Sequence, residues 1–109
     1  MALTRKVLGQ QAPGATTETD LYTVPSATEA VCSSIVICNR GASAATFRVS
    51  VSVGGGATAN KDYIYYDVTI AGNDTFIATI GITLGAEDKV KVYASSTNLS
   101  FNLFGQEIA

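Results

Sequence analysis

The chain has 109 residues, the usual size of one domain, and 15% of them are charged, against about 25% in a typical soluble domain. Its seven Lys and Arg residues are scattered and the net charge is −2, so it lacks the basic stripe that phosphate binding requires, and we expect no nucleic-acid partner. Histidine is absent, which excludes Ser-His-Asp and Cys-His catalytic groups within one chain and removes the commonest metal ligand.

The residue pattern predicts strands along the whole chain, separated by clusters of Gly, Asn, Asp and Ser. The predicted strands are residues 3–10, 21–24, 29–39, 46–53, 61–70, 75–84, 89–94 and 99–108.

Two of these strands have informative patterns. Residues 34–38 are apolar on both faces, which predicts a central strand that is covered on both sides. Phe47 to Val53 alternate, with apolar residues on one face, which is typical of a sheet with one buried face. Residues 39–43 between these two strands predict a hairpin connection, and a bend is expected near Asp67.

Short strands at regular spacing are typical of a sandwich or a barrel. Because no linker divides the chain, we predict an all-β protein with a single antiparallel β-sandwich domain over residues 1–109 and jelly-roll or immunoglobulin-like connections. Residues 1–10 are expected to form an N-terminal arm or an edge strand.

Two cysteines lie on one predicted strand. In an extended chain Cys32 and Cys38 are ~20 Å apart, too far for a disulfide, which needs Cα atoms within roughly 7 Å. We interpret both as small buried side chains in a reducing compartment. No apolar run approaches the ~20 residues of a membrane span, and no apolar stretch of signal-peptide type follows the start of the chain. We therefore expect a protein made and kept in the cytoplasm, with no membrane contact.

Aromatic residues on two predicted strands exceed what one core face needs. Alternation places Tyr63 and Tyr65 on one face and Tyr66 on the other, and Tyr93 lies on a second strand. One set therefore needs a second partner, either a neighbouring subunit or a stacked carbohydrate. The alternative is one core tyrosine and one partly exposed tyrosine.

The last strand poses the same question. Its core face is apolar, whereas Phe104 falls on the opposite face beside Gly105. This pair marks either a bulge that returns Phe104 to the core or an aromatic side chain that faces a partner. We expect intersubunit contacts at Leu3, Tyr63, Tyr65, Tyr66, Tyr93 and Phe104.

Several short segments, in order from residue 3 to residue 108, resemble a family of small virion proteins of tailed phages and prophages. The segments are 21–25 (LYTVP), 35–41 (IVICNRG), 46–49 (TFRV), 62–67 (DYIYYD), 81–84 (GITL), 92–94 (VYA) and 98–108 (NLSFNLFGQEI). The resemblance implies a β-sandwich module located in the virion, either a capsid decoration (cement) protein or a module of the tail, baseplate or fibre. It further implies a homotrimer that contacts the major capsid protein or tail and fibre proteins.

Three hypotheses of function follow. The first is a structural protein of the virion without cofactor, metal or catalytic residues. The second is a carbohydrate-binding or host-receptor module, in which tyrosines stack on sugar rings beside Asn and Asp. The third, an enzyme, would need clustered carboxylates in a concave pocket, and we expect no enzyme.

Overall fold

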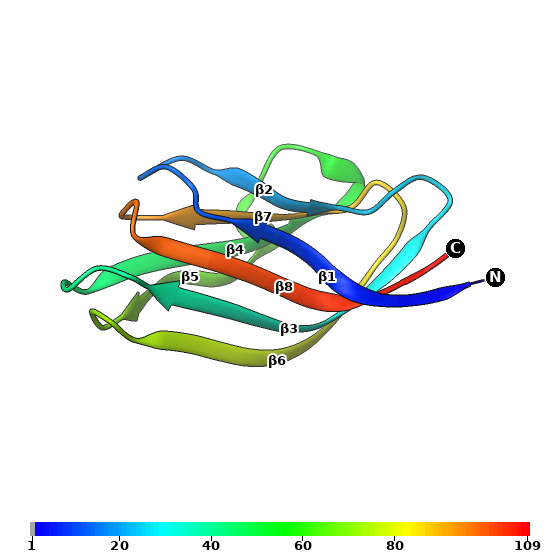
Figure 1. Ribbon diagram of the computed structural model, residues 1–109. Helices are drawn as coiled ribbons and strands as arrows, with labels where there is room; N and C mark the ends of the chain where they lie inside the picture. Colours follow the sequence, from blue (N-terminus) through cyan, green and yellow to red (C-terminus); the bar gives the residue numbers. More distant parts are fainter. Residues whose placement is uncertain (1) are drawn as a thin grey trace.

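The computed structural model describes residues 2–109, which form eight β-strands in two four-stranded sheets (Figure 1). The elements are β1 (Leu3–Gln11), β2 (Thr19–Thr23), β3 (Glu29–Asn39), β4 (Ala45–Ser52), the 3₁₀ turns η1 (Val53–Gly55) and η2 (Asn60–Asp62), β5 (Tyr63–Ile70), β6 (Thr75–Leu84), β7 (Lys89–Ala94) and β8 (Leu99–Ile108). The predicted bounds of β3, β6, β7 and β8 are confirmed, and the other four strands differ by one or two residues at their ends.

The strand order shows that the sandwich is a jelly roll. Sheet A has the order β1-β8-β3-β6 and sheet B the order β2-β7-β4-β5, and all their pairings are antiparallel. The first half of the chain therefore pairs with the second half, β1 with β8, β2 with β7, β3 with β6 and β4 with β5. The chain is one long hairpin, turned between β4 and β5 and rolled across two sheets, which is the jelly-roll connection and not the immunoglobulin one.

The core lies between the two sheets. Its largest fully buried side chains include Phe47 from sheet B and Phe101 from sheet A, whose ring centroids are 6.3 Å apart in an edge-to-face arrangement. Ile35 and Ile37 project inward from β3 and are also fully buried. Burial of each such side chain stabilises the fold by roughly 1.5–3 kcal/mol.

The segment between β3 and β4 is not a hairpin, because these strands belong to different sheets. The buried side chain of Asn39 holds this corner. Its Nδ2 donates to the carbonyl oxygens of Ser43 (2.9 Å) and Ile70 (3.2 Å), while its Oδ1 accepts from the backbone of Gly41 (3.0 Å). The Asn39 side chain thus gives these backbone groups the hydrogen bonds that pairing between the two strands of a hairpin would have supplied.

β3 occupies the centre of sheet A, between β8 and β6, as predicted. Among the described residues, however, only its inner face is covered. Val36 and Cys38 lie on the outer face of the sheet and are half-buried, so the expected cover on both sides is wrong for this chain by itself.

The two cysteines are free, as predicted. Cys32 is buried in the core, and burial raises the pKa of its thiol to about 11. Cys38 is only half-buried, which corrects the expectation that both are core residues. An extra residue in β3 at Ser33 separates the two cysteines onto opposite faces.

Phe104 stays on the outer face of sheet A, because the bulges beside it lie in the neighbouring strands. The register shifts at Leu8 in β1 and at Ser33 in β3, while β8 itself alternates without interruption. Of the two alternatives for Phe104, the bulge that returns it to the core is therefore wrong, and the side chain faces outward, while a partner for it stays a prediction. Gly105 is needed for a different reason, which is that a Cβ there would overlap the carbonyl oxygen of Val31.

We predict that Gly105→Ala lowers the free energy of unfolding by about 1–3 kcal/mol, since β3 and β8 must move apart to admit a methyl group. Urea denaturation monitored by circular dichroism measures this. Gly14→Ala is the matched control, because a Cβ at Gly14 meets only Thr17 Oγ1 at 3.8 Å. Equal midpoints for both variants would contradict the close approach of the two strands.

A polar triad joins β1, β2 and β8 at one end of the sandwich. The Tyr22 hydroxyl donates to Glu107 Oε2 (2.6 Å), and Lys6 Nζ lies 3.0 Å from Glu107 Oε1. The hydrogen bond from Tyr22, followed by that from Lys6, holds the pKa of Glu107 below its ordinary value of 4.5. Burial, followed by the bond to Glu107, raises the pKa of Tyr22.

This triad predicts an acid-sensitive contribution to stability. The pKa of Glu107 is lower in the folded state than its ordinary value of 4.5. The carboxylate therefore contributes fully to the stability of the fold at pH values above 4.5, and this contribution is lost as the pH falls through the pKa of the folded state. We expect the free energy of unfolding to fall less steeply between about pH 5 and about pH 3 in Glu107→Gln than in the parent chain. Parallel slopes in urea titrations at each pH would refute this role.

Candidate interaction surfaces

The six residues predicted to make contacts separate onto three parts of the molecule. Leu3 and Phe104 lie on the outer face of sheet A, and Leu3 is 54% exposed. Tyr63, Tyr66 and Tyr93 lie on the outer face of sheet B, where the contacts described below bring them together. Tyr65 points between the sheets. The first strand is an edge strand paired with β8 from Leu3 onward, rather than a free arm.

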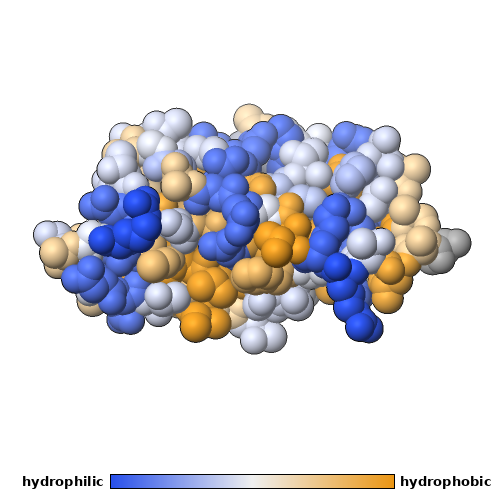
Figure 2. Space-filling view, in the orientation of Figure 1, coloured by the Kyte–Doolittle hydropathy of each residue, from blue (hydrophilic) through white to orange (hydrophobic). Residues whose placement is uncertain are grey.

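The outer face of sheet A carries apolar side chains in two adjacent rows over its middle. Val7 pairs with Phe104 on β8 in one row, and Val36 on β3 pairs with Ile77 on β6 in the next. Polar residues complete the two rows, Ser34 and Thr79 in the first and Gln10 and Asn102 in the second. Val7 is 46% exposed and Ile77 69% exposed. Figure 2 looks onto this face and shows apolar atoms over its centre with hydrophilic ones to either side. We call Val7, Val31, Val36, Ile77 and Phe104 the sheet A patch.

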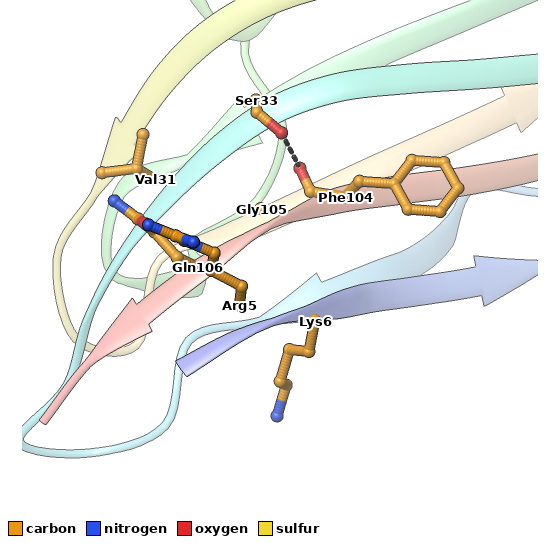
Figure 3. Close-up of a pocket in the computed structure, with 7 residues that line it drawn as sticks. All are labelled: Arg5, Lys6, Val31, Ser33, Phe104, Gly105 and Gln106. Atoms are coloured by element: carbon orange, nitrogen blue, oxygen red, sulfur yellow. Dashed lines mark hydrogen bonds between the residues drawn. The ribbon is translucent and has the colours of Figure 1, made fainter. Parts of the chain in front are cut away.

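A shallow hollow of about 430 Å³ adjoins this patch where the bulges bend the sheet (Figure 3). Phe104, Gly105 and Val31 form its apolar part, and Arg5, Lys6 and Gln106 supply hydrogen-bond donors. The Ser33 hydroxyl donates to the carbonyl oxygen of Phe104 (3.2 Å) and so holds the bulge in place. Apolar contact flanked by donors is the chemistry of a docking contact between proteins.

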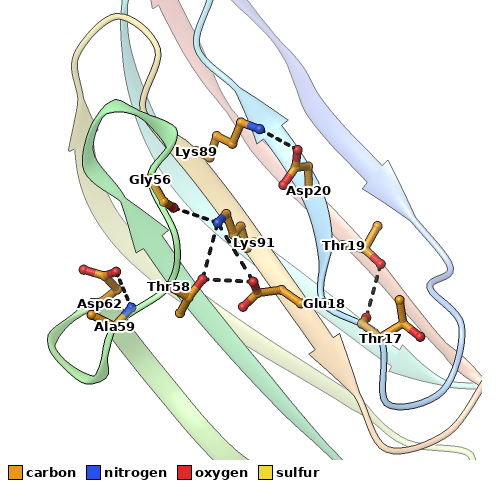
Figure 4. Close-up of polar contacts among 10 residues, drawn as sticks. All are labelled: Thr17, Glu18, Thr19, Asp20, Gly56, Thr58, Ala59, Asp62, Lys89 and Lys91. Atoms are coloured by element: carbon orange, nitrogen blue, oxygen red, sulfur yellow. Dashed lines mark hydrogen bonds and ion pairs between the residues drawn. The ribbon is translucent and has the colours of Figure 1, made fainter.

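The outer face of sheet B is partly covered by residues 53–62, which fold back over β4 and β7 (Figure 4). Lys91 Nζ donates to the carbonyl oxygen of Gly56 (2.9 Å) and to Thr58 Oγ1 (3.4 Å), and it lies 3.9 Å from Glu18 Oε1. Ser50 and Ser52 are buried beneath this segment. Contacts within the chain therefore satisfy the Lys91 ammonium group in this part of sheet B, whereas the buried Ser52 Oγ has no hydrogen-bond partner among the described residues.

The same segment corrects one prediction about β4. Val53 was expected on the core face with Phe47, but it is 82% exposed. The strand ends at Ser52 because the chain turns through Gly54, whose φ is +70°. Glycine adopts this backbone conformation without steric cost.

Two bulges in β5 decide where its tyrosines point. Ser50 pairs with Tyr63 and Val49 with Tyr65, so two residues of β5 oppose one of β4 and Tyr63 turns to the outer face. A second extra residue lies between Tyr65 and Val68, at Asp67, whose φ is +52°. The predicted bend near Asp67 is confirmed, but the expectation that Tyr63 and Tyr65 share a face is wrong.

The outward tyrosines surround an arginine. The Arg48 guanidinium carbon lies 4.3 Å from the ring centroid of Tyr66 and 4.4 Å from that of Tyr93. Asp67 accepts from Arg48 Nε (2.7 Å) and Nη2 (3.3 Å), and this bond is the main cause that raises the pKa of Arg48. Tyr63 meets Tyr66 edge-on at 4.9 Å. We call these five residues the tyrosine cluster, whose ring faces are in part already occupied by Arg48.

Tyr65 fits the alternative of a core tyrosine. Its ring lies 5.9 Å from Phe47 and 5.3 Å from Phe76, and it packs against the buried core. With Ile64, Ile80 and Ile82 it also lines a hollow of about 200 Å³ at the side of the sandwich where β5 and β6 form the sheet edges.

Sequence reasoning missed the exposed isoleucines of this side. Ile64 is 43% exposed, and Ile77 on β6 is the most exposed isoleucine among the described residues. A signal was present, because residues 75–84 contain neither a charged residue nor a proline. The other large apolar side chains of this strand point toward the core, whereas Ile77 points outward.

Residues 2–109 contain no helix that is long and apolar enough to cross a membrane. Over the same part of the chain, no group of three or more His, Cys, Asp or Glu side chains is placed to hold a metal ion.

Comparison with known proteins does not assign the chain to a family. No protein-family model matches it, and a search of curated proteins finds no match either. The resemblance to phage virion proteins therefore stays a prediction.

We predict that Arg48→Lys lowers the midpoint of thermal unfolding by roughly a few degrees, since lysine keeps the charge but cannot stack a planar group between two rings. Differential scanning calorimetry measures the shift. Lys61→Arg, at a side chain that is 83% exposed, is the control and should leave the midpoint unchanged. An unchanged midpoint in Arg48→Lys would show that the ring contacts contribute nothing beyond charge.

Proposed function

We propose that the chain is a structural component of a bacteriophage particle, a capsid decoration protein that stabilises the shell through protein–protein contacts. A location in the tail, baseplate or fibre is the alternative within the same proposal. The function is mechanical, because a rigid module binds neighbours over a defined surface and resists their separation.

One observation carries the proposal, which is that sheet A presents large apolar side chains on its outer face as well as on its inner face. Its inner face fills the core, and its outer face presents the sheet A patch without cover from the described residues. The largest exposed apolar patches on soluble monomers commonly mark interaction sites.

The fold is compatible with this proposal but does not decide it, because jelly rolls occur in capsid proteins and in sugar-binding proteins alike. The phage context comes from the resemblance of the short segments 21–108. The low charge of the chain agrees with a surface that is covered by neighbours, since 15% charged residues leave few solubilising groups.

A carbohydrate-binding or receptor module is the second candidate, and the gathering of Tyr63, Tyr66 and Tyr93 on one surface favours it. Sugar recognition by stacking uses free ring faces. Arg48 lies over the rings of both Tyr66 and Tyr93, so the cluster is better suited to stabilise sheet B than to receive a sugar. We therefore rank this candidate below the structural one.

We predict that the purified chain co-sediments with particles of the encoding phage assembled without it, and that Val36→Lys abolishes this. A charge at the centre of the sheet A patch would have to be desolvated on docking. Ala15→Lys adds the same charge to an exposed loop and should bind normally.

Electron microscopy of the reconstituted particles then shows whether the density lies on the capsid or on the tail. Failure of the parent chain to sediment with either would refute the proposal. Circular dichroism shows that each variant is folded before it is scored.

A further inference from the structure

The four edge strands of the sandwich differ in how they are protected against pairing with other chains. Folded proteins usually guard such edges with charges, prolines, bulges or short strands. β1 carries Arg5 and Lys6, β2 has only five residues and contains Asp20, and β5 has two bulges and Asp67. β6 is ten residues long and contains no charge and no proline.

The unprotected edge of β6 is also regular. Thr75 to Thr79 pair with Cys38 to Ser34 of β3 in unbroken register, and the irregularity comes only afterwards, near Gly81. On its other side β6 is the last strand of sheet A. Residues 75–79 therefore present a straight row of backbone donors and acceptors to a strand from outside.

The side of the sandwich next to this edge is open and apolar. The hollow lined by Ile64, Tyr65, Ile80 and Ile82 lies there, and Ile77 stands on the outer face of the same strand. On the opposite side, β1 and β2 contact each other and close the sandwich. In Figure 1 the closed side is at the top and the open side, with β5 and β6, at the bottom.

We propose that two copies of the chain pair edge to edge through β6, antiparallel, with a twofold axis near Ile77. The two four-stranded A sheets then join into one continuous sheet, and the two open sides cover each other. This inference rests on the proposed function only in taking the chain to be an assembly protein. It adds the surface through which copies meet and the symmetry of the contact.

The absence of charged residues on β6 favours a second copy of the chain as the strand that pairs with it. In a twofold contact each residue meets the same patch of the partner, so a charged edge would repel itself. β6 is the edge strand without a charged residue, and its self-pairing sets no like charges opposite each other. A head-to-tail contact with β1 would instead bring Arg5 and Lys6 to an edge with no acidic partner.

The contact along β6 is short. With the axis at Ile77, Thr75 of one copy pairs with Thr79 of the other, so the two strands overlap over five residues, ~17 Å, and the molecule measures 19 Å across its thinnest dimension. The projected area is therefore about 300 Å², below the ~800 Å² per partner of a stable interface, so we expect a weak pair that forms at the upper end of the concentration range. A twofold pair departs from the threefold assembly that the resemblance implies.

Sedimentation velocity over about a hundredfold range of concentration tests the inference. The parent chain should reach twice the mass of the 11.3 kDa monomer. Ile77→Lys should weaken the pair at least tenfold, because two ammonium groups would meet beside the axis. Val7→Lys is the matched control, with the same charge on an exposed residue at the opposite edge of the same sheet, and should pair as the parent does.

Thr79→Lys, at an exposed residue of the same edge, replaces Ile77→Lys if circular dichroism shows the latter to be unfolded. A monomer at every concentration, a trimer, or a dimer that both edge variants leave intact would overturn the inference. Its failure is distinct from that of the proposed function. A monomer that still sediments with phage particles removes only the pairing, and a dimer that does not sediment removes only the virion role.

Discussion

The pairing of the two halves of the chain is the constraint on which the rest of the structure depends. Because β1 pairs with β8, β2 with β7, β3 with β6 and β4 with β5, the chain can bury one face of each sheet only by rolling. The roll brings β1 beside β2 at one side and leaves β5 and β6 as the edges of the other. The core, the closed side and the open side all follow from this one arrangement.

Most of the fold was predictable from the sequence, and the reasons are local. Turns such as residues 71–74 and 85–88 are marked by Gly, Asn and Asp, which supply left-handed or side-chain-bonded backbone, so the strands between them were located closely. The connectivity was not predictable in the same way. Asn39 makes the corner between two sheets through contacts with Ile70, which is distant in sequence and gives no local signal.

The candidate surfaces were less predictable than the fold, because each bulge reverses the face of the residues beyond it. Strict alternation placed Tyr63 with Tyr65, and one extra residue in β5 separated them. In β8, by contrast, the bulges lie in the neighbouring strands, and alternation placed Phe104 correctly on the outer face. A pattern read along one strand carries no information about extra residues in the strand beside it.

The outer faces of the two sheets differ in how many of their side chains already make contacts within the chain, so a neighbour meets a different surface on each side. The outer face of sheet B is partly covered by residues 53–62, and its tyrosine cluster is engaged in its own contacts, in which Arg48 and Asp67 form an ion pair. Sheet A has no comparable cover among the described residues, and its patch reaches the free edge at Ile77. A neighbour that approaches from the side of sheet A therefore finds apolar surface, whereas one that approaches sheet B displaces contacts already made.

The position of Ile77 links the patch to the edge. It lies in the row of Val36 on the outer face and also on the strand that borders the open side. If two copies join through β6, their patches meet at the axis and form one apolar surface of double width on a single continuous sheet. In the proposed capsid role, a pair that docks through one patch holds its second patch at high local concentration beside the neighbouring shell protein, so that even weak contacts at each patch add up to firm attachment. Pairing at the edge and docking on the face would thus reinforce each other without any new contact within either surface.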